Sequence, residues 1–159
     1  MATILAIQIS PSAGKKMQQL QVVKAIEGKG LNGDRYALDT GAYHQGHPRD
    51  PIRHVTFLDK SQLDAANTVA LPNVVWTFAD TRRNILTVGW DDINEFIGKM
   101  FQFGPAIFRG FELADPCDRP TSLSGKPGFK HDFTERGGGL RAEILHGGLF
   151  GIQDKMALL

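Results

Sequence analysis

Short runs of apolar residues, separated by glycine and proline, dominate the hydrophobic pattern of this chain. In residues 2–9 apolar side chains fall on both faces of an extended segment, which predicts a first strand. Similar short patterns predict further strands at 20–25, 54–58, 100–103, 106–113, 141–145 and 150–158. Glycine-containing turns are predicted at 27–30 and at 104–105.

Helix signals are confined to two short segments. Asp59 followed by Gln62 forms a capping-box pattern, in which both side chains accept hydrogen bonds from backbone N–H groups at a helix start. A similar cap at Asp92 precedes a short run with apolar residues on one face. We therefore expect short helices near 59–69 and 92–97.

The remaining long segments, 40–51 and 123–139, are rich in glycine, proline or polar residues and are predicted to be irregular loops. Several short strands with two or three short helices indicate a mainly β, barrel-like fold. The pattern argues against a parallel α/β sheet, because the long and regularly spaced helices that it requires are missing.

Composition places the chain among ordinary globular proteins. Its 159 residues are 42% hydrophobic and 22% charged, which predicts one domain over residues 1–159. The net charge of +1 predicts neither nucleic acid nor a membrane surface as a partner, so any anion site must be local. No apolar run approaches the roughly 20 residues of a membrane span, and the N-terminus lacks signal-peptide features. A single cysteine permits no intramolecular disulfide and favours a cytoplasmic location.

Cys117 is the first candidate for chemistry. It follows an apolar strand and lies between Pro116 and Pro120, so the thiol is expected in a stiff turn at a strand end. Arg119 would favour the thiolate, whereas the neighbouring aspartates would oppose it. A small packing cysteine remains the alternative. A phosphatase loop is excluded, because no histidine precedes the cysteine and Leu123 stands where the arginine is required.

Two arginine-bearing motifs are candidates for anion binding. Arg35 follows Asp34 after a glycine-rich turn, and in extended backbone the two side chains would point to opposite sides. Arg82 and Arg83 precede an apolar strand, again on opposite faces, and guanidinium forks suit phosphate or carboxylate. A structural ion pair and a solvated charge pair are the respective alternatives.

The segment 136–141, Arg-Gly-Gly-Gly-Leu-Arg, is the most unusual string in the chain. Consecutive glycines can turn their N–H groups inward to form an anion nest, to which Arg136 and Arg141 would add charge. A hairpin loop is the alternative. No Walker sequence follows, and the five histidines, His44 and His47 included, show no zinc-binding spacing.

In order and spacing, these motifs resemble the molybdenum cofactor sulfurase C-terminal (MOSC) family. The matching strings are GKGLNGDRYA (28–37), RHVTFLD (53–59), TRRNILTVG (81–89), NEFIGKMFQFG (94–104), PCDRP (116–120) and RGGGLRAEILHGG (136–148). They cover most of the chain, and the single cysteine stands where the family places its own. The closing Gly-Asp turn of the family is replaced by Gln153-Asp154, and we expect no room in these 159 residues for the additional N-terminal barrel of larger members.

The resemblance implies a β-barrel-like domain that works with the molybdenum cofactor (molybdopterin). Cys117 would be the catalytic residue, carrying a persulfide or ligating molybdenum, for which a soft sulfur is suited. By the same resemblance, the cofactor and its phosphate would be bound by Arg35, Arg82, Arg83, Asn84, Arg136, Gly138 and Arg141. The family is also associated with pyridoxal phosphate binding.

Three interpretations of function follow. The first is a molybdenum-cofactor-dependent oxidoreductase, acting on N-hydroxylated compounds with an electron-transfer partner, or a sulfur transferase. The second is a non-catalytic module that holds the cofactor or a sulfur atom for a partner, such as a sulfur-donor protein. The third is a retained fold without a cofactor.

Overall fold

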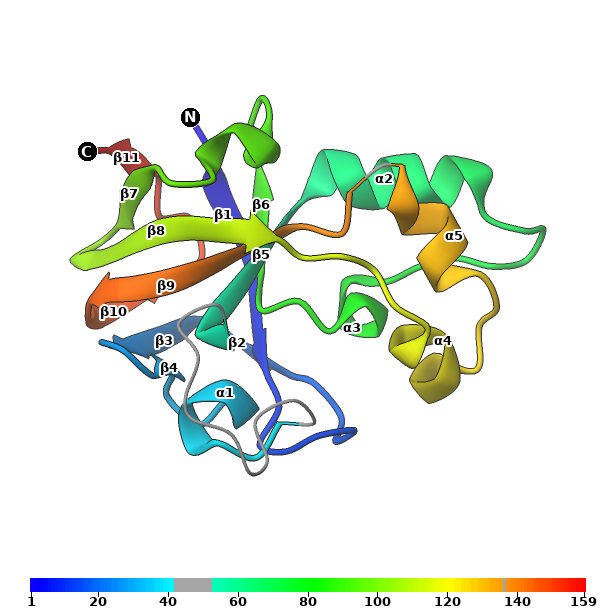
Figure 1. Cartoon of the computed structure of the whole chain (residues 1–159), viewed down its shortest axis with the longest axis horizontal. Coiled ribbons are helices and arrows are strands. Elements are labelled where there is room, and N and C mark those ends of the chain that lie inside the picture. The colour runs from blue at the N-terminus through cyan, green and yellow to red at the C-terminus, as the bar shows by residue number, and fades with distance from the viewer. Residues whose placement is uncertain (42–52, 136) are drawn as a thin grey trace.

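The computed structural model describes residues 1–41, 53–135 and 137–159. Its centre is an eight-stranded sheet that curls into a half-barrel (Figure 1), in the order β11-β7-β8-β9-β5-β6-β1-β2. Its strands are β1 (Thr3–Ile9), β2 (Gln18–Leu20), β5 (Val55–Asp59), β6 (Ile85–Val88), β7 (Met100–Phe103), β8 (Ala106–Leu113), β9 (Leu140–His146) and β11 (Ala157–Leu158). Neighbours are antiparallel except the parallel pair β5 and β6. The prediction of a mainly β fold is confirmed.

A smaller antiparallel sheet, in the order β10-β3-β4, covers one side of the half-barrel. Its strands are β3 (Val22–Ile26), β4 (Gly30–Leu31) and β10 (Gly148–Gly151). The main core lies between the two sheets, where the Phe57 ring packs edge-to-face on Phe101 and Phe108 at centroid distances of 5.3 Å. Such aromatic pairs add to the stabilisation from apolar burial.

The helices are short and gather largely at one end of the large sheet (Figure 1). They are α1 (Arg35–Leu38), α2 (Lys60–Val69), α3 (Phe78–Thr81), α4 (Arg119–Ser124), α5 (Phe129–Thr134) and the 3-10 helix η2 (Ile93–Phe96). A second core lies under α2 and α5, where Trp76 packs on Phe129 and Phe133. The Trp76 indole Nε1 donates to Asp132 Oδ2 at 2.8 Å, so the polar edge of this buried ring is satisfied.

The capping patterns in the sequence predicted both of their helices correctly. The helix expected from Asp59 is α2, and both halves of its capping box form, with the Asp59 side chain accepting from Ser61 N and Gln62 Oε1 accepting from Asp59 N. The helix expected at 92–97 is the 3-10 turn η2, whose cap donor is Asn94 N.

Three of the predicted segment boundaries were wrong. Segment 123–139 is not one loop, because α4 extends into it and α5 lies within it, where burial of Phe129 and Phe133 stabilises a helix too short to persist alone. Segment 150–158 is not one strand but the end of β10, a turn and β11. Segment 20–25 is divided between β2 and β3.

The loop predicted at 40–51 falls almost entirely outside the described residues. Within the parts of the chain that the structure describes, no helix combines the length and the apolar character that a bilayer crossing requires.

Candidate functional site

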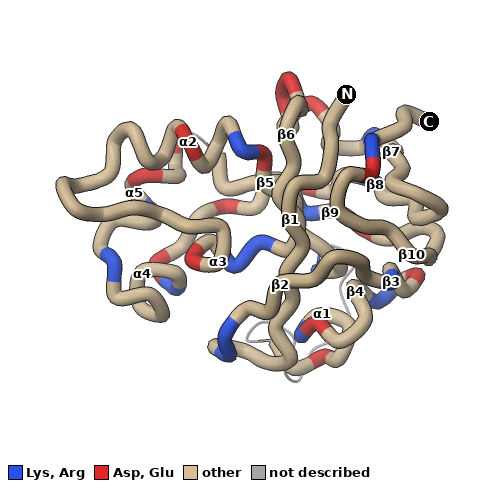
Figure 2. Tube along the Cα trace, turned by 180° about the vertical axis from the view of Figure 1, so that it is seen from behind, with Lys and Arg blue, Asp and Glu red and all other residues tan. Residues whose placement is uncertain are grey.

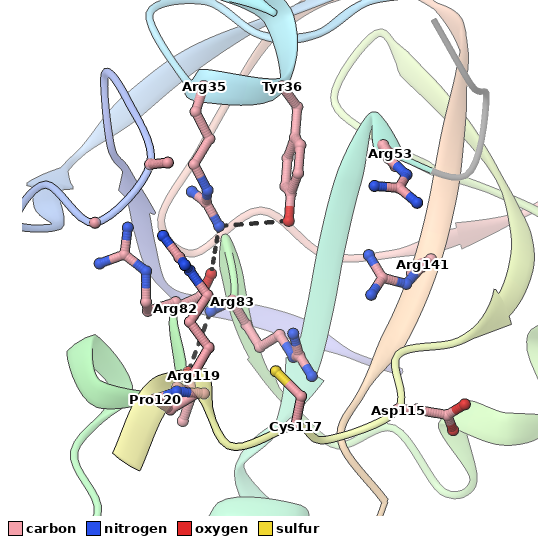
Figure 3. Close-up of a pocket in the computed structure, with 13 residues that line it drawn as sticks. Arg35, Tyr36, Arg53, Arg82, Arg83, Asp115, Cys117, Arg119, Pro120 and Arg141 are labelled. Carbon is pink, nitrogen blue, oxygen red and sulfur yellow. Dashed lines mark hydrogen bonds between the residues drawn. The ribbon is translucent and has the colours of Figure 1, made fainter. Parts of the chain in front are cut away.

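A pocket of about 260 Å³ opens among α1, the end of α3 and the start of α4. It is lined by Ala13, Gly14, Arg35, Tyr36, Arg53, Thr81, Arg82, Arg83, Asp115, Cys117, Arg119, Pro120 and Arg141. These residues come from segments far apart in the sequence (Figure 3). In Figure 2, basic segments lie beside α3 and in the loop before β2.

Cys117 lies in the segment that joins β8 to α4. Ala114 and Pro120, near the two ends of this segment, are buried, whereas Cys117 itself is exposed. Its sulfur points into the pocket toward Arg83, while the Asp115 carboxylate points away (Figure 3). The thiol is therefore held at the pocket rather than packed in the core.

Arg35 begins α1, and its side chain is anchored deep in the pocket wall. Its Nη1 donates to Asp34 Oδ1 at 3.1 Å, and its Nη2 donates to Arg82 O at 3.1 Å and to Tyr36 Oη at 3.4 Å. Asp34 is fully buried and also accepts from Ser10 N at 2.9 Å. The expectation that Asp34 and Arg35 point to opposite sides was wrong, because the chain turns into a helix at this point. Arg35 is both a structural ion-pair partner and a pocket residue.

Arg82 and Arg83 both line the pocket, although an extended chain would have separated them. The reason is that Arg82 ends α3 in the left-handed conformation, with φ of 58°. Arg82 Nη1 donates to Lys15 O at 2.9 Å. Arg83 Nε donates to Gly138 O at 2.6 Å and its Nη2 to Ala114 O at 3.1 Å. Arg83 thus ties the glycine segment to the segment that carries Cys117.

Asn84 does not line the pocket but joins the strands that lie beside it. The side chain is fully buried: Oδ1 accepts from Thr56 N at 3.1 Å and Nδ2 donates to Gln8 O at 3.2 Å. Thr56 on β5 pairs in register with Arg141 on β9. Asn84 therefore holds β5, β6 and β1 together at the level where Arg83 and Arg141 reach the pocket.

Gly138 faces the site with its carbonyl, which accepts a hydrogen bond from Arg83, whereas an anion nest would present backbone N–H groups. A side chain at Gly138 would collide with the carbonyl of Ala114, and one at Gly139 with the carbonyl of Phe57. The glycines thus permit close approach of backbones beside the pocket. Arg136, predicted from the same string, lies outside the described residues.

Crowding of cations perturbs the arginines. Burial is the largest effect on Arg83 and lowers its pKa to about 10, and repulsion from Arg141 acts in the same direction. Burial, followed by repulsion from Arg35 and Arg119, likewise lowers the pKa of Arg82 to about 10. Both guanidinium groups still carry their protons at neutral pH, so the pocket presents a strong positive field.

Among the pocket residues that sequence reasoning did not assign to the site are Tyr36, Arg53 and Arg119. Tyr36 adjoins Arg35 in the motif, and its burial would raise the phenol pKa. Attraction from Arg35, Arg141 and Arg83 outweighs burial and leaves the pKa of Tyr36 lowered. No hydrogen bond or ion pair joins Arg119 to the part of the chain that the structure describes, so its guanidinium is available to a ligand.

Metal sites in proteins are commonly formed by clusters of His, Cys, Asp and Glu side chains. In residues 1–41, 53–135 and 137–159, no three of them gather as a metal site would require. His44 and His47 fall outside these ranges. Among the described residues that line the pocket, Cys117 is the one that offers a sulfur ligand to a metal.

The fold is shared with solved bacterial proteins. A YuaD protein from Bacillus subtilis superposes with a TM-score of 0.73 at 15% identity, covering 98% of this chain and 94% of that one. YiiM from Geobacillus stearothermophilus superposes with a TM-score of 0.72 at 11% identity, covering 100% of this chain and 75% of that one. YiiM from Escherichia coli superposes with a TM-score of 0.67 at 16% identity, covering 99% of this chain and 69% of that one.

At these identities the similarity extends to the fold alone. No protein-family model matches the chain. No curated protein matches it either. The function must therefore be argued from the pocket itself.

Proposed function

We propose that this protein is of the MOSC type and binds the molybdenum cofactor in the arginine-lined pocket. The phosphate of the cofactor would lie on the guanidinium groups, and Cys117 would offer its sulfur to the metal. The motif strings between Gly28 and Gly148 and the fold shared with YuaD and YiiM support this assignment.

One observation carries the proposal: an exposed thiol shares a single pocket with six arginines. Guanidinium forks match the geometry of phosphate oxygens. A thiolate is a soft ligand, which suits a thiophilic metal better than a hard hydroxyl or carboxylate does. The donor set of the pocket thus fits a ligand that combines a phosphate with a thiophilic metal.

Three of the arginines can be given distinct roles from their hydrogen bonds. Arg35 and Arg83 are held by protein acceptors, so they set the pocket's shape and field. Arg119 lies at the start of α4, two residues after Cys117, and donates to no described residue. We assign Arg119 to direct contact with the ligand phosphate, and Arg35 and Arg83 to positioning.

When bound, the cofactor supplies redox-active molybdenum, and the activity to test is reduction of N-hydroxylated compounds with an external electron donor. The chain's own contribution is to orient the phosphate and to present the Cys117 sulfur at a fixed place. Without turnover, the same binding would make the protein a carrier or storage module for the cofactor.

A second candidate function is sulfur carriage on Cys117. The pocket volume of about 260 Å³ lies below the roughly 300–1,000 Å³ usual for ligand pockets. That space accommodates a phosphate group or a small anion, so an entire pterin cofactor would extend beyond it. This observation favours a persulfide carrier that donates sulfur to a partner.

The proposal is tested on protein purified from a host that makes the cofactor and is supplied with molybdate. Molybdenum is measured by elemental analysis, and the pterin by fluorescence after oxidation. We expect both in the wild type, loss of molybdenum in Cys117→Ser, and loss of both in Arg119→Gln. Arg109→Gln is the matched control, because Arg109 pairs with Glu143 on the sheet surface.

A Cys117→Ser protein with full molybdenum content would contradict the role of the sulfur. Wild-type protein without pterin would contradict cofactor binding itself.

A further inference from the structure

The surroundings of Cys117 suit attack on a small anion. The thiol lies on a short segment pinned at the buried Ala114 and Pro120. Pro116 and Pro120 restrict the backbone on both sides of the cysteine. Because the sulfur is exposed and points into the pocket (Figure 3), a reactant can reach it without movement of the core.

The charge of the pocket selects the reactant. Six arginines and one carboxylate, Asp115, line it among the described residues, and that carboxylate points away from the sulfur. Repulsion among Arg35, Arg82 and Arg119 is one reason why the pKa of Arg82 falls to about 10. A dianion relieves this repulsion, whereas a neutral or singly charged reactant relieves less of it.

We propose that Cys117 accepts sulfur from a sulfane-sulfur oxyanion, a dianion in which a reactive sulfur is bonded to a sulfonate group, with thiosulfate as the simplest example. This inference rests on the sulfur-carrying form of the proposed function and names its sulfur donor. The oxyanion lies on the guanidinium groups, with its outer sulfur directed toward the Cys117 sulfur.

The reaction is a single displacement. The Cys117 thiolate supplies an electron pair to the outer sulfur and forms a new S–S bond. The S–S bond of thiosulfate breaks, and its electron pair leaves with sulfite. Cys117 becomes a persulfide, sulfite is released, and no external oxidant or reductant is needed.

The residues around the sulfur match what this displacement needs. The attacking and leaving groups are both anionic, so fixed cations lower the repulsion between thiolate and dianion as they approach. Sulfite leaves as an anion and requires no acid, which agrees with an Asp115 side chain directed elsewhere. Phosphate and sulfate would bind the same arginines without reacting, because they have no sulfane sulfur to transfer.

Arg119 is the group expected to contact the dianion directly. It is adjacent to the reactive segment, lines the pocket and has no hydrogen bond or ion pair to the described chain. Its removal should therefore slow the reaction without disturbing a structural bond. Arg83, by contrast, is tied to Gly138 and Ala114, so its substitution would perturb the frame as well.

The test uses the full chain, reduced and freed of small molecules. Protein is incubated with thiosulfate, the gain of one sulfur atom at Cys117 is followed by intact mass, and released sulfite is measured in parallel. Cyanide added afterwards should remove the outer sulfur as thiocyanate and restore the thiol. We expect equal amounts of persulfide and sulfite in the wild type and neither in Cys117→Ser.

The variants test the arginine site. Arg119→Gln should lower the second-order rate constant by about 10-fold or more, since charged hydrogen bonds to the anion are lost. Arg109→Gln, with the same change of charge on the surface, should react within about twofold of the wild type, as expected for a distant screened charge. Sulfate should inhibit competitively, and chloride at equal ionic strength should inhibit less.

Three outcomes would overturn the inference. The first is no persulfide with thiosulfate while a polysulfide solution does persulfidate Cys117, which would leave the sulfur carrier standing and refute only this donor. The second is no persulfide with either reagent, which would refute sulfur carriage as well. The third is equal slowing in Arg119→Gln and Arg109→Gln, which would show that the pocket arginines do not bind the donor.

Discussion

Binding of a dianion should stabilise the folded protein, because the pocket holds cations that repel one another. The perturbation is sulfate, added at constant ionic strength in exchange for chloride. Arg82 and Arg83 have pKa values lowered from 12.5 to about 10. For a base, a lower pKa in the folded state means that its charged form destabilises the fold at every pH below about 10.

The magnitude follows from these shifts. The shift of Arg83 corresponds to at most about 3 kcal/mol at neutral pH. Arg82 is only half-buried, so solvent screens its charge and its share is smaller. Burial is the largest cause of the lowered pKa values, and a bound anion relieves it only partly. The stabilisation from binding is therefore smaller than these two contributions together. Sulfate at about 100 times its dissociation constant stabilises by about 2.7 kcal/mol. For a protein of this size, that corresponds to a rise in Tm of roughly 5–11 °C.

The assay is thermal unfolding followed by circular dichroism, with the Tm recorded as a function of sulfate concentration. The stabilisation should saturate, should persist at any pH well below about 10 because the guanidinium groups remain charged, and should be reduced in Arg119→Gln but not in Arg109→Gln. If chloride at matched ionic strength raised the Tm as much as sulfate, or if both variants responded like the wild type, the reasoning from pocket repulsion would be refuted.

Three further predictions address other parts of the structure. Phe133→Ala should lower the free energy of unfolding by about 3–5 kcal/mol because it opens the second core, whereas Phe111→Ala, on an exposed side chain, should cost far less in the same chemical denaturation. Saturating sulfate should raise the pKa of Tyr36 by weakening the cations that lower it, seen as a shift in tyrosinate absorbance that Tyr36→Phe abolishes. Gly139→Ala should destabilise the protein more than Gly98→Ala, since both have positive φ but only Gly139 would meet a backbone carbonyl, and the Gly98 change should cost about 1–2 kcal/mol.

The sequence was most informative where a signal is local. The Asp59 and Gln62 cap predicted α2 because both halves of a capping box lie within one turn of chain. The helix α5 was missed because its six residues follow a glycine and are mostly polar. Only packing of Phe129 and Phe133 on Trp76, more than fifty residues earlier in the sequence, stabilises it.

In the candidate site too, local signals could be found in the sequence, whereas long-range contacts could not. Cys117 and the paired arginines could be singled out from their neighbours in the chain, but their convergence depends on strand register. Asn84 illustrates this point: next to Arg83 it resembled a ligand contact, yet its amide joins β5 to β1. Arg53 had no distinguishing neighbour, and only the fold places it in the pocket.

The distribution of charge is the strongest argument that this pocket has a function. The whole chain carries a net charge of +1, yet six arginines line one pocket of about 260 Å³. Folding alone does not favour that arrangement, since burial and mutual repulsion lower the pKa of Arg82 and Arg83 and so weaken the folded state. Perturbed groups of this kind concentrate at functional sites, where a ligand supplies the missing charge. Because the exposed sulfur of Cys117 points into the same space, the ligand of this pocket should be an anion that also reacts with, or coordinates to, sulfur.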